Sequence, residues 1–413
     1  MTGGPVHDLA IIGAGAAGLM AAAEAARLGL DVRVLEGQKE PGLKILISGG
    51  GRCNVTNARV SEKDYAAGCA HTLRHVLGTA SPRAMVAFFE AHGAPLALQE
   101  TGEFFSADDK ARTVRDALVR AVRENGGRID CGHRVNTIVT QDGSFNIVGH
   151  DFVITARAVI IATGGLSYPA TGSDGAGYRL AQAFGHNIIP THPALVPFIA
   201  STDTFGNISG ITLPVRLSLW AEERKLRSVE GPLLFTHEGF SGPAPMEMSG
   251  YWLAAREKHG CAVRVDFLPD IKPDDTDFFL RPALAARSVK NILTALLPER
   301  LVVVLLGAAG VDAQRPAGQL TRDERKAILS ALRAFALPLK DVAGYARAEV
   351  TSGGVDLKEL KGATLASRLQ EGLYFAGEVL DVNGRIGGFN LHWAWASGIA
   401  AARAVAKYLK GKP

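Results

Sequence analysis

The sequence predicts an α/β fold in which both ends of the chain contribute to one Rossmann-like dinucleotide-binding domain. Near the N-terminus, an apolar strand runs into a glycine turn and an alanine-rich helix. Near the C-terminus, another strand leads into a glycine pair that opens the last helix. Between these motifs the pattern changes to short β-alternating runs and then to helical spacing. We therefore expect a discontinuous domain interrupted by an insertion.

The N-terminal motif has the spacing G-x-G-x-x-G between a strand and a helix. The first glycine permits a tight turn, the second lets the backbone approach a pyrophosphate, and the third lets helix and strand pack closely. The diphosphate would lie on the N–H groups at the start of the helix. The predicted contacts are Gly13, Gly15, Ala16, Ala17 and Gly18. Glu36 ends the next strand, about 20 residues on, where its carboxylate can bind a ribose diol and repel a 2′-phosphate. NAD and FAD both meet these requirements.

A second glycine-rich loop follows within residues 42–57. It contains three consecutive glycines flanked by lysine, serine, arginine and asparagine, so it is rich in backbone donors and cationic side chains. Such a loop can wrap a diphosphate and reach along a ribityl chain, which favours FAD. Its candidate ligands are Lys44, Ser48, Gly49, Gly50, Arg52, Cys53 and Asn54.

Two later segments strengthen the prediction of FAD. A buried strand ends in Ala162, Thr163, Gly164 and Gly165, which resembles the strand end that lies against the cofactor in flavoproteins with two dinucleotide folds. In those flavoproteins the backbone contacts the adenine at the position that Val135 occupies in this chain. The C-terminal motif, residues 377–390, supplies carboxylates that can bind ribityl hydroxyls. It also supplies backbone amides at a helix N-terminus, which can stabilise negative charge on a reduced flavin. Its predicted ligands are Gly377, Glu378, Asp381, Gly387, Gly388, Phe389 and Asn390. Trp393 and Trp395 are interpreted as packing residues of the last helix.

Six segments together resemble the HI0933/YhiN-like family of FAD-binding proteins, also called BaiN-like or aminoacetone-oxidase-like. They run in family order along the chain: residues 48–57, 162–173, 192–197, 234–243, 350–355 and 377–390. The resemblance implies an inserted β-barrel-like substrate domain that carries a helical subinsertion. The chain departs from common relatives at Glu103, Phe104-Phe105, Asn383, Phe389 and His392. These departures indicate a distinct subgroup.

The motifs and the resemblance together predict the domain boundaries. The FAD-binding domain is expected to comprise residues 1–190 and 345–413, since both segments contribute to one cofactor site. Residues 191–270 are predicted to form the β-rich insertion, and residues 271–344 the helical subinsertion.

The predicted chemistry is that of an FAD-dependent oxidoreductase, because the isoalloxazine supplies the redox reaction and the protein orients the substrate. No second strand–glycine–helix motif is present for a resident NADH or NADPH, and the glycines of residues 172–177 have the wrong order. A nicotinamide donor would therefore bind transiently. The candidate proton donors are Cys53, whose pKa the neighbouring Arg52 is expected to lower, and Tyr168, His237 and His392. Each of the four also has a purely structural interpretation.

Three classes of function remain open at this stage. The first is reduction of an unsaturated small-molecule acceptor by NAD(P)H. The second, implied by the family resemblance, is reduction of uridine to dihydrouridine in ribosomal RNA. The net charge of +4 would then favour binding of the polyanionic RNA. The third is a non-catalytic flavin-loaded binding or sensor protein. The sequence does not choose the acceptor, the nicotinamide or the oligomeric state.

Composition excludes several other classes. Hydrophobic residues make up 47% and charged residues 21%, as expected for a globular protein with a sizeable core. No apolar run reaches the roughly 18 residues of a membrane span, and no secretory signal pattern is seen. The four cysteines are widely spaced, so neither a disulfide framework nor a metal site is expected. These features predict a cytoplasmic protein.

Overall fold

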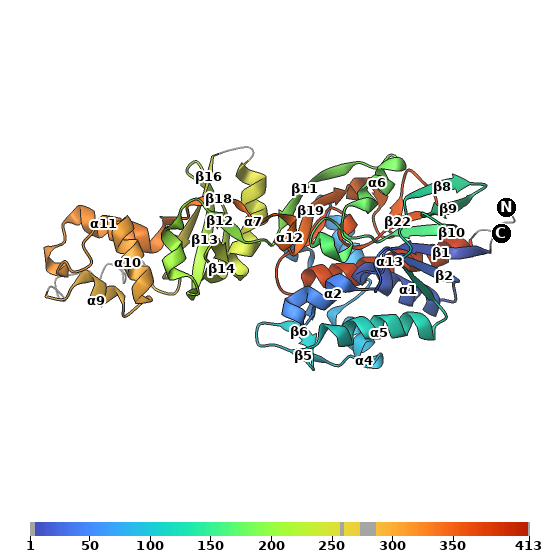
Figure 1. Cartoon of the computed structure of the whole chain (residues 1–413), viewed down its shortest axis with the longest axis horizontal. Helices are drawn as coiled ribbons and strands as arrows, with labels where there is room; N and C mark the ends of the chain where they lie inside the picture. The colour runs from blue at the N-terminus through green and yellow to red at the C-terminus, as the bar shows by residue number, and fades with distance from the viewer. Residues whose placement is uncertain (1–4, 257–259, 273–285, 412–413) are drawn as a thin grey trace. The chain divides into compact units, whose positions relative to one another are not determined.

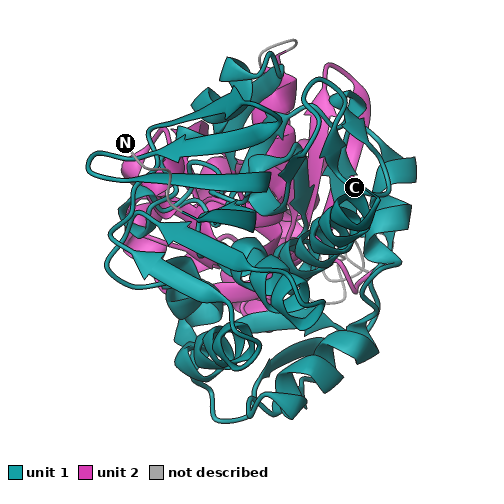
Figure 2. Cartoon of the chain, turned by 90° about the vertical axis from the view of Figure 1, so that its right-hand side faces the viewer, with its two compact units in different colours: residues 1–193, 348–413 teal, residues 194–347 magenta. Residues whose placement is uncertain are grey.

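The computed structural model describes residues 5–256, 260–272 and 286–411. The chain forms two compact units (Figure 2). Unit 1 consists of residues 1–193 and 348–413, and unit 2 of residues 194–347. Both chain ends therefore belong to one unit, which the middle of the chain interrupts.

Unit 1 is built on a nine-stranded sheet (Figure 1). Its main order is β20-β21-β22-β10-β1-β2-β7, and β9 and β8 continue from β10. The pairs β7–β2, β2–β1, β1–β10 and β10–β22 are parallel, so the sheet joins strands from both ends of the chain. The strands are β1 (Val6–Ile12), β2 (Val32–Glu36), β7 (Arg128–Cys131), β8 (Thr137–Gln141), β9 (Ser144–Val148), β10 (Val153–Ile161), β20 (Leu360–Lys361), β21 (Ala366–Ser367) and β22 (Leu373–Phe375).

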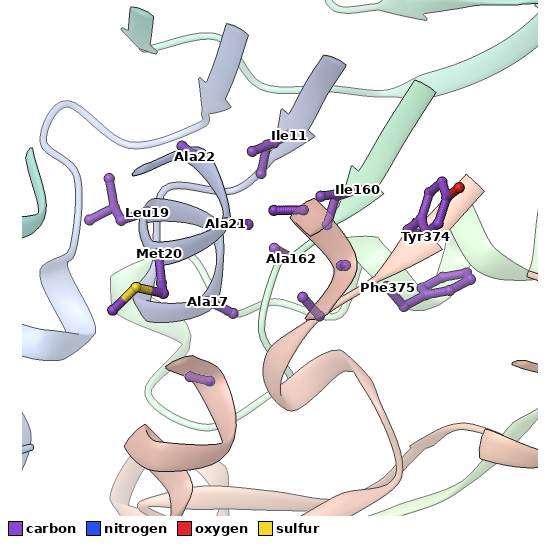
Figure 3. Close-up of a cluster of buried hydrophobic side chains, with 14 of the residues drawn as sticks. Ile11, Ala17, Leu19, Met20, Ala21, Ala22, Ile160, Ala162, Tyr374 and Phe375 are labelled. Atoms are coloured by element: carbon purple, nitrogen blue, oxygen red, sulfur yellow. The ribbon is translucent and has the colours of Figure 1, made fainter. Parts of the chain in front are cut away.

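The first and last long helices of the chain pack against each other in unit 1. They are α1 (Ala16–Arg27) and α13 (Phe389–Lys410), and the small residues of α1 permit a close approach. A Cβ added at Gly398 would lie 2.6 Å from the Ala17 carbonyl oxygen. Figure 3 shows the buried side chains around α1, with Phe375 of β22 and Ile160 of β10 in the same cluster. This packing ties the C-terminal helix to the N-terminal glycine motif.

Both tryptophans of α13 are buried packing residues. Trp393 Nε1 donates to the Gly377 carbonyl oxygen at 3.2 Å, and Trp395 Nε1 donates to the Val55 carbonyl oxygen at 2.8 Å. Each indole therefore satisfies its polar atom while filling the core, as a buried tryptophan requires.

Smaller elements complete unit 1. Three short sheets have the strand orders β3-β6-β5, β23-β4 and β11-β19. The strands are β3 (Asn54–Asn57), β4 (Tyr65–Ala67), β5 (Leu96–Leu98), β6 (Glu103–Ser106), β11 (Ile188–Ala194), β19 (Val350–Val355) and β23 (Val382–Gly384). The helices are α2 (Leu43–Ile47), α3 (Ala70–Leu77), α4 (Pro82–Ala91), α5 (Ala111–Glu124) and α6 (Ala176–Ala183).

Unit 2 has an antiparallel seven-stranded sheet in the order β17-β16-β13-β14-β15-β12-β18. The two edge strands, β17 and β18, are separated in sequence by only Leu337 and Pro338, so the sheet must curl until its edges approach each other. A cluster of phenylalanines fills the interior, including the stacked pair Phe205 and Phe235. The strands are β12 (Phe198–Ala200), β13 (Thr212–Ala221), β14 (Arg224–Phe235), β15 (Gly239–Ser241), β16 (Cys261–Asp266), β17 (Phe335–Ala336) and β18 (Leu339–Val342).

The helices of unit 2 are α7 (Pro243–Arg256), α9 (Val289–Leu293), α10 (Glu299–Ala308), α11 (Arg322–Arg333) and α12 (Gly344–Arg347). Helices α9, α10 and α11 form a helical part inserted between β16 and β17 (Figure 1). The predicted fold class is confirmed: a Rossmann-like domain carries an inserted β-barrel-like domain with a helical subinsertion. Among the described residues, no helix is both long and apolar enough to cross a membrane.

The α1–α13 contact leads to a first prediction. The substitution Gly398→Ala should lower the free energy of unfolding by about 1 to 3 kcal/mol, because the new methyl group overpacks the contact with Ala17. The matched control is Gly307→Ala in α10, where nothing lies within 4 Å of the added Cβ. That change should stabilise the protein by about 0.5 kcal/mol. Urea unfolding of both variants provides the test, and equal stability of the two would contradict the packing described.

Candidate dinucleotide-binding site

The N-terminal glycine turn has the geometry of a pyrophosphate loop. Gly13 has φ +101° and donates its N–H to the Leu35 carbonyl oxygen at 2.8 Å, which ties the turn between β1 and α1 to β2. A Cβ at Gly18 would lie only 1.9 Å from the Gly13 carbonyl oxygen. Gly15, by contrast, has nothing within 4 Å of an added Cβ, and no side chain caps α1 there. The N–H groups of α1, starting at Ala16 and Ala17, therefore begin beside open space.

Glu36 lies at the end of β2 beside this turn. Its Oε2 accepts a hydrogen bond from the Ala14 N–H at 2.7 Å, and its Oε1 accepts one from the Gln38 N–H at 2.8 Å. Burial raises the pKa of the Glu36 carboxyl, while these backbone hydrogen bonds and the charge of Arg134 oppose the rise. The carboxylate is thus held rigidly, and Glu36 lines the adjoining pocket.

A pocket lies beside Glu36. Its walls come from the glycine turn, the end of β2, the segment before β8 and the loop that leads into α6. The lining residues are Ile12, Gly13, Leu35, Glu36, Gly37, Gln38, His133, Arg134, Val135, Gly172, Asp174, Ala176 and Leu180. Predicted positions Gly13, Glu36 and Val135 therefore meet around one cavity suited to an adenosine.

An ion pair that the motifs did not predict joins two walls of this pocket. Arg134 donates through Nη2 to the Asp174 carboxylate, and Asp174 Oδ1 also accepts from the Ala176 N–H at 3.1 Å, at the start of α6. The only signal in the sequence for the position of Arg134 was that it directly precedes Val135. Asp174 lies within the glycine segment 172–177, whose order excluded a second dinucleotide motif, so nothing marked it.

Lys44 and Glu378, predicted separately as cofactor ligands, form an ion pair in the structure. Lys44 Nζ also donates to Ser167 Oγ at 2.5 Å, and Ser167 Oγ donates to Glu378 Oε1 at 2.5 Å. The Thr351 N–H donates to the same carboxylate oxygen at 2.8 Å. This network joins four segments of unit 1. Ser167 and Thr351 were not predicted, because their role depends on contacts between residues distant in the sequence.

The triple-glycine loop adopts a backbone that glycine favours. Gly49, Gly50 and Gly51 have φ of +56°, +67° and +87°, in the left-handed region. Ser48 Oγ donates to the Ile45 carbonyl oxygen at 2.7 Å. The Arg52 guanidinium stacks on the Phe105 ring at 4.3 Å and lies 3.8 Å from Asp109 Oδ1. Nothing lies within 4 Å of a Cβ added at Gly50, so this part of the loop is open to a ligand.

The expected activation of Cys53 by Arg52 is wrong. The Cys53 side chain is fully buried, and burial raises the pKa of its thiol to about 12, although a hydrogen bond with Ser48 opposes the rise. Such a thiol stays protonated at neutral pH and is not a thiolate nucleophile. Cys53 has φ +59°, in the left-handed region, whereas Arg52 before it is right-handed at φ −97°.

One buried polar atom next to the start of α13 suits a flavin. Asn54 Oδ1 is buried and has no hydrogen-bond partner among the described residues, and a Cβ at Gly388 would lie 2.5 Å from it. A buried acceptor of this kind requires a donor, which a flavin ring can provide. The Asn390 side chain, in contrast, bonds to both the N–H and the carbonyl oxygen of Gly384, at 2.7 and 2.8 Å. Its backbone N–H remains the part suited to a ligand.

The remaining predicted ligands lie on the same unit. Phe389 is fully buried beneath the Arg385 guanidinium, which stacks on its ring at 4.2 Å. Burial, with the nearby charge of Asp356, raises the pKa of the Asp381 carboxyl. The strand-end residues 162–165 pack closely against other backbone and side chains: a Cβ at Gly13 would lie 2.7 Å from the Ala162 carbonyl oxygen, and one at Gly164 2.7 Å from Ser173 Oγ. Gly377 and Gly387 have φ of +79° and +123°.

The four candidate proton donors are not brought together within one unit. His392 is buried on α13, where its Nδ1 lies 2.8 Å from Thr56 Oγ1. Tyr168 lies in a left-handed conformation, φ +51°, just before a short 3₁₀ turn. His237 belongs to unit 2 and is exposed between β14 and β15. Among the residues described, no group of three or more His, Cys, Asp or Glu side chains is arranged to bind a metal.

The comparison with known proteins agrees with this geometry. The model of the HI0933-like protein Rossmann domain matches residues 7–404. The chain belongs to the HI0933-like family. It is 35% identical over 402 residues to the ribosomal RNA dihydrouridine synthase of Escherichia coli, covering 96% of this chain and 97% of that protein. It is 32% identical over 408 residues to the 3-dehydro-bile acid delta(4,6)-reductase of Clostridium scindens, covering 97% and 100%.

Among solved structures, the 3-ketosteroid delta1-dehydrogenase of Sterolibacterium denitrificans has the same fold, with a TM-score of 0.52 and 15% identity. The match covers 97% of this chain and 99% of that chain. Membership in the HI0933-like family supports an FAD-dependent oxidoreductase. The residues that hold the cofactor remain a prediction from sequence and geometry.

Two neighbouring glycines allow the pyrophosphate loop to be tested. The Gly15→Ala variant should keep its apo stability within about 1 kcal/mol, since the added methyl group meets only open space, but should bind FAD at least about tenfold more weakly. The Gly18→Ala variant should lose about 3 kcal/mol or more of stability through its clash with Gly13. Fluorescence titration with FAD and urea unfolding measure both effects. Unchanged FAD affinity in Gly15→Ala would contradict the assignment of the loop.

The buried imidazole of His392 predicts a pH dependence of stability. Burial lowers the pKa of His392 from 6.5 to about 4, although a backbone hydrogen bond with Ala80 opposes the shift. Because the unfolded chain takes up this proton first, stability is full above about pH 6.5 and falls as the pH drops towards 4. Between about pH 7.5 and about pH 5 this one group should cost about 2 kcal/mol.

The test is urea unfolding of wild type and His392→Gln at both pH values, because glutamine does not titrate yet can bond to Thr56. The variant should show a smaller loss of stability on acidification than wild type. Identical losses in the two proteins would exclude the buried neutral imidazole described here.

Proposed function

We propose that this protein is an FAD-dependent reductase that converts uridine to dihydrouridine in ribosomal RNA. The observation that supports this best is the match along nearly the whole length of both chains to relatives named ribosomal RNA dihydrouridine synthase. It holds at 35% identity in Escherichia coli and at 34% in Haemophilus influenzae. Coverage of 96–98% on both sides means that neither chain has a large domain that the other lacks.

The cofactor proposal is supported by how the described residues fit FAD. An uncapped helix start at Gly15, the fixed carboxylate of Glu36 and the pocket reaching Val135 suit the adenosine diphosphate half. The open loop at Gly50 and the orphaned Asn54 Oδ1 suit the ribityl and flavin half. When bound, the flavin would supply the two-electron redox chemistry that amino-acid side chains lack.

The described side chains would then have three tasks. The Lys44–Glu378–Ser167 network would orient hydroxyl groups of the cofactor, since its carboxylate and ammonium are fixed by partners on other segments. The amides at the start of α13 would stabilise negative charge next to them. Arg134 and Asp174 would close over the adenosine pocket.

The overall reaction adds two hydrogens across a carbon–carbon double bond conjugated to a carbonyl group. In uridine this is the C5=C6 bond, and NADH or NADPH is proposed as the transient donor: NAD(P)H, a proton and uridine give NAD(P)⁺ and dihydrouridine. A proton donor is needed at the ring carbon that does not receive hydride. Tyr168 and His237 remain the candidates, since Cys53 and His392 are both buried.

A second candidate function is reduction of a conjugated double bond in a small molecule. It is supported by the relative named as a reductase of a 3-dehydro-bile acid, which is 32% identical along its entire length. Both candidates require the same cofactor and the same electron donor. They differ in whether a polyanionic substrate must bind.

The proposed function predicts two separate results. Under anaerobic conditions NADH or NADPH should bleach the flavin absorbance of the purified protein. Addition of ribosomal RNA lacking dihydrouridine should restore it and produce dihydrouridine, detected by mass spectrometry of the digested nucleosides. Bleaching that is reversed by a steroid dienone but not by RNA would favour the second candidate. A bound flavin that neither nucleotide reduces would overturn both.

A further inference from the structure

One face of the unit 2 sheet combines a half-buried tryptophan with cations that have no acidic partner among the described residues. Alternation along β13 places Val215, Leu217 and Leu219 in the core and puts Ser218 and Trp220 on the opposite face. Cross-strand partners share a face, so the register adds Lys225 and Ser228 of β14 and Arg264 of β16. We call Ser218, Trp220, Lys225, Ser228 and Arg264 the β13 outer face.

The aromatic ring on this face is already paired with a cation. The Arg264 guanidinium lies over the Trp220 ring, 4.9 Å from its centroid. Trp220 Nε1 is buried and has no hydrogen-bond partner among the described residues. The indole therefore contributes a flat apolar surface to the face and no polar bond to the fold. An arginine stacked on a tryptophan extends that surface and adds a positive charge to it.

Charge distinguishes these cations from their neighbours in unit 2. Most other arginines of the sheet region are neutralised: Arg216 bonds Glu230 at 2.6 Å, Arg256 bonds Asp341 at 2.9 Å, and Arg227 lies 3.8 Å from Glu247. No ion pair to Arg264, Lys225 or the adjacent Arg224 is found in the part of the chain that the structure describes. Lys225 and Arg224 are also exposed.

Two carboxylates lie next to this group in sequence. Glu222 and Glu223 form the exposed turn between β13 and β14, and Glu222 has φ +53°. Neither pairs with Arg224, Lys225 or Arg264 among the described residues. The cations thus remain available to an external anion.

We propose that the β13 outer face binds a single-stranded segment of the RNA substrate. Unstacked bases stack on aromatic rings and on arginine planes, and phosphates bind unpaired lysine and arginine. The Ser218 hydroxyl, with both donor and acceptor capacity, suits a 2′-hydroxyl group. Ser228 Oγ donates to the Leu217 carbonyl oxygen at 3.3 Å, so it offers an acceptor only. This inference rests on the proposed function, because a small acceptor would need no second contact surface for a polyanion. An acidic protein partner would use the charges but would not depend on the ring.

The experiment uses the full-length flavin-loaded protein and a fluorescein-labelled single-stranded RNA copied from ribosomal RNA. Fluorescence anisotropy gives Kd over a range of potassium chloride concentrations. The variants are Trp220→Leu, Trp220→Phe, Lys225→Gln and Arg264→Gln. The charge-matched control is Lys326→Gln, an exposed lysine on α11. Trp220→Phe keeps a stacking ring and loses no hydrogen bond, since Nε1 has no partner.

Trp220→Leu should raise Kd about tenfold, and Trp220→Phe should stay close to wild type. Lys225→Gln and Arg264→Gln should each reduce the salt slope of log Kd by about 0.7, as expected for one lost phosphate contact on a single strand. Lys326→Gln should change neither. Inorganic polyphosphate, which has the charges of RNA but no bases, should bind Trp220→Leu as tightly as wild type.

The outcomes separate this inference from the proposed function. If wild type reduces uridine in ribosomal RNA but all variants bind RNA like wild type, the docking surface is wrong and the function stands. If wild type binds no RNA and reduces only small acceptors, both are overturned. If Trp220→Leu weakens polyphosphate binding equally, the ring does not stack on bases, and the RNA assignment of this face fails.

Discussion

The close approach of backbone around the glycine turn is the constraint on which unit 1 depends. Gly18 brings α1 against the Gly13 carbonyl, and Gly398 brings α13 against the other side of α1. These two contacts hold the start of α1 at the carboxyl end of the parallel strands, where neighbouring segments surround it. Because β10 and β22 extend the same sheet, residues more than 300 positions apart in the sequence reach one region. An uncapped helix start, a pocket beside it and a fixed carboxylate follow from that arrangement.

Local signals were sufficient to predict the Rossmann-like domain and the residues around the glycine turn, whereas the β-barrel-like insertion was implied by the family resemblance. Gly13, Gly15 and Gly18 have roles set by backbone geometry within a few residues, so their spacing alone indicates a strand, a turn and a helix. Glu36 could be predicted for the same reason, since it ends the strand next to the turn. The two indoles of α13 were also interpreted correctly, because a helix that is apolar on most faces must be buried.

Long-range contacts were beyond such reasoning. Ser167 and Thr351 fix the Glu378 carboxylate, yet no spacing relates positions 167, 351 and 378. The Arg134–Asp174 pair and the curl of the unit 2 sheet likewise depend on which distant segments become neighbours. For Cys53, a local signal gave a wrong prediction. Its sequence neighbour Arg52 suggested an activated thiol, but Arg52 stacks on Phe105 while Cys53 is buried. Burial, which the sequence of a loop does not reveal, reverses the direction of the pKa shift.

The central claim is that this site holds FAD, and the flavin content of the purified protein tests it most directly. The protein should show a flavin absorbance spectrum and, on denaturation, release FAD rather than FMN in a ratio of about one per chain, as the proposed binding of the adenosine half at Glu36 requires. Absence of bound FAD, even after the purified protein is incubated with an excess of it, would contradict the account.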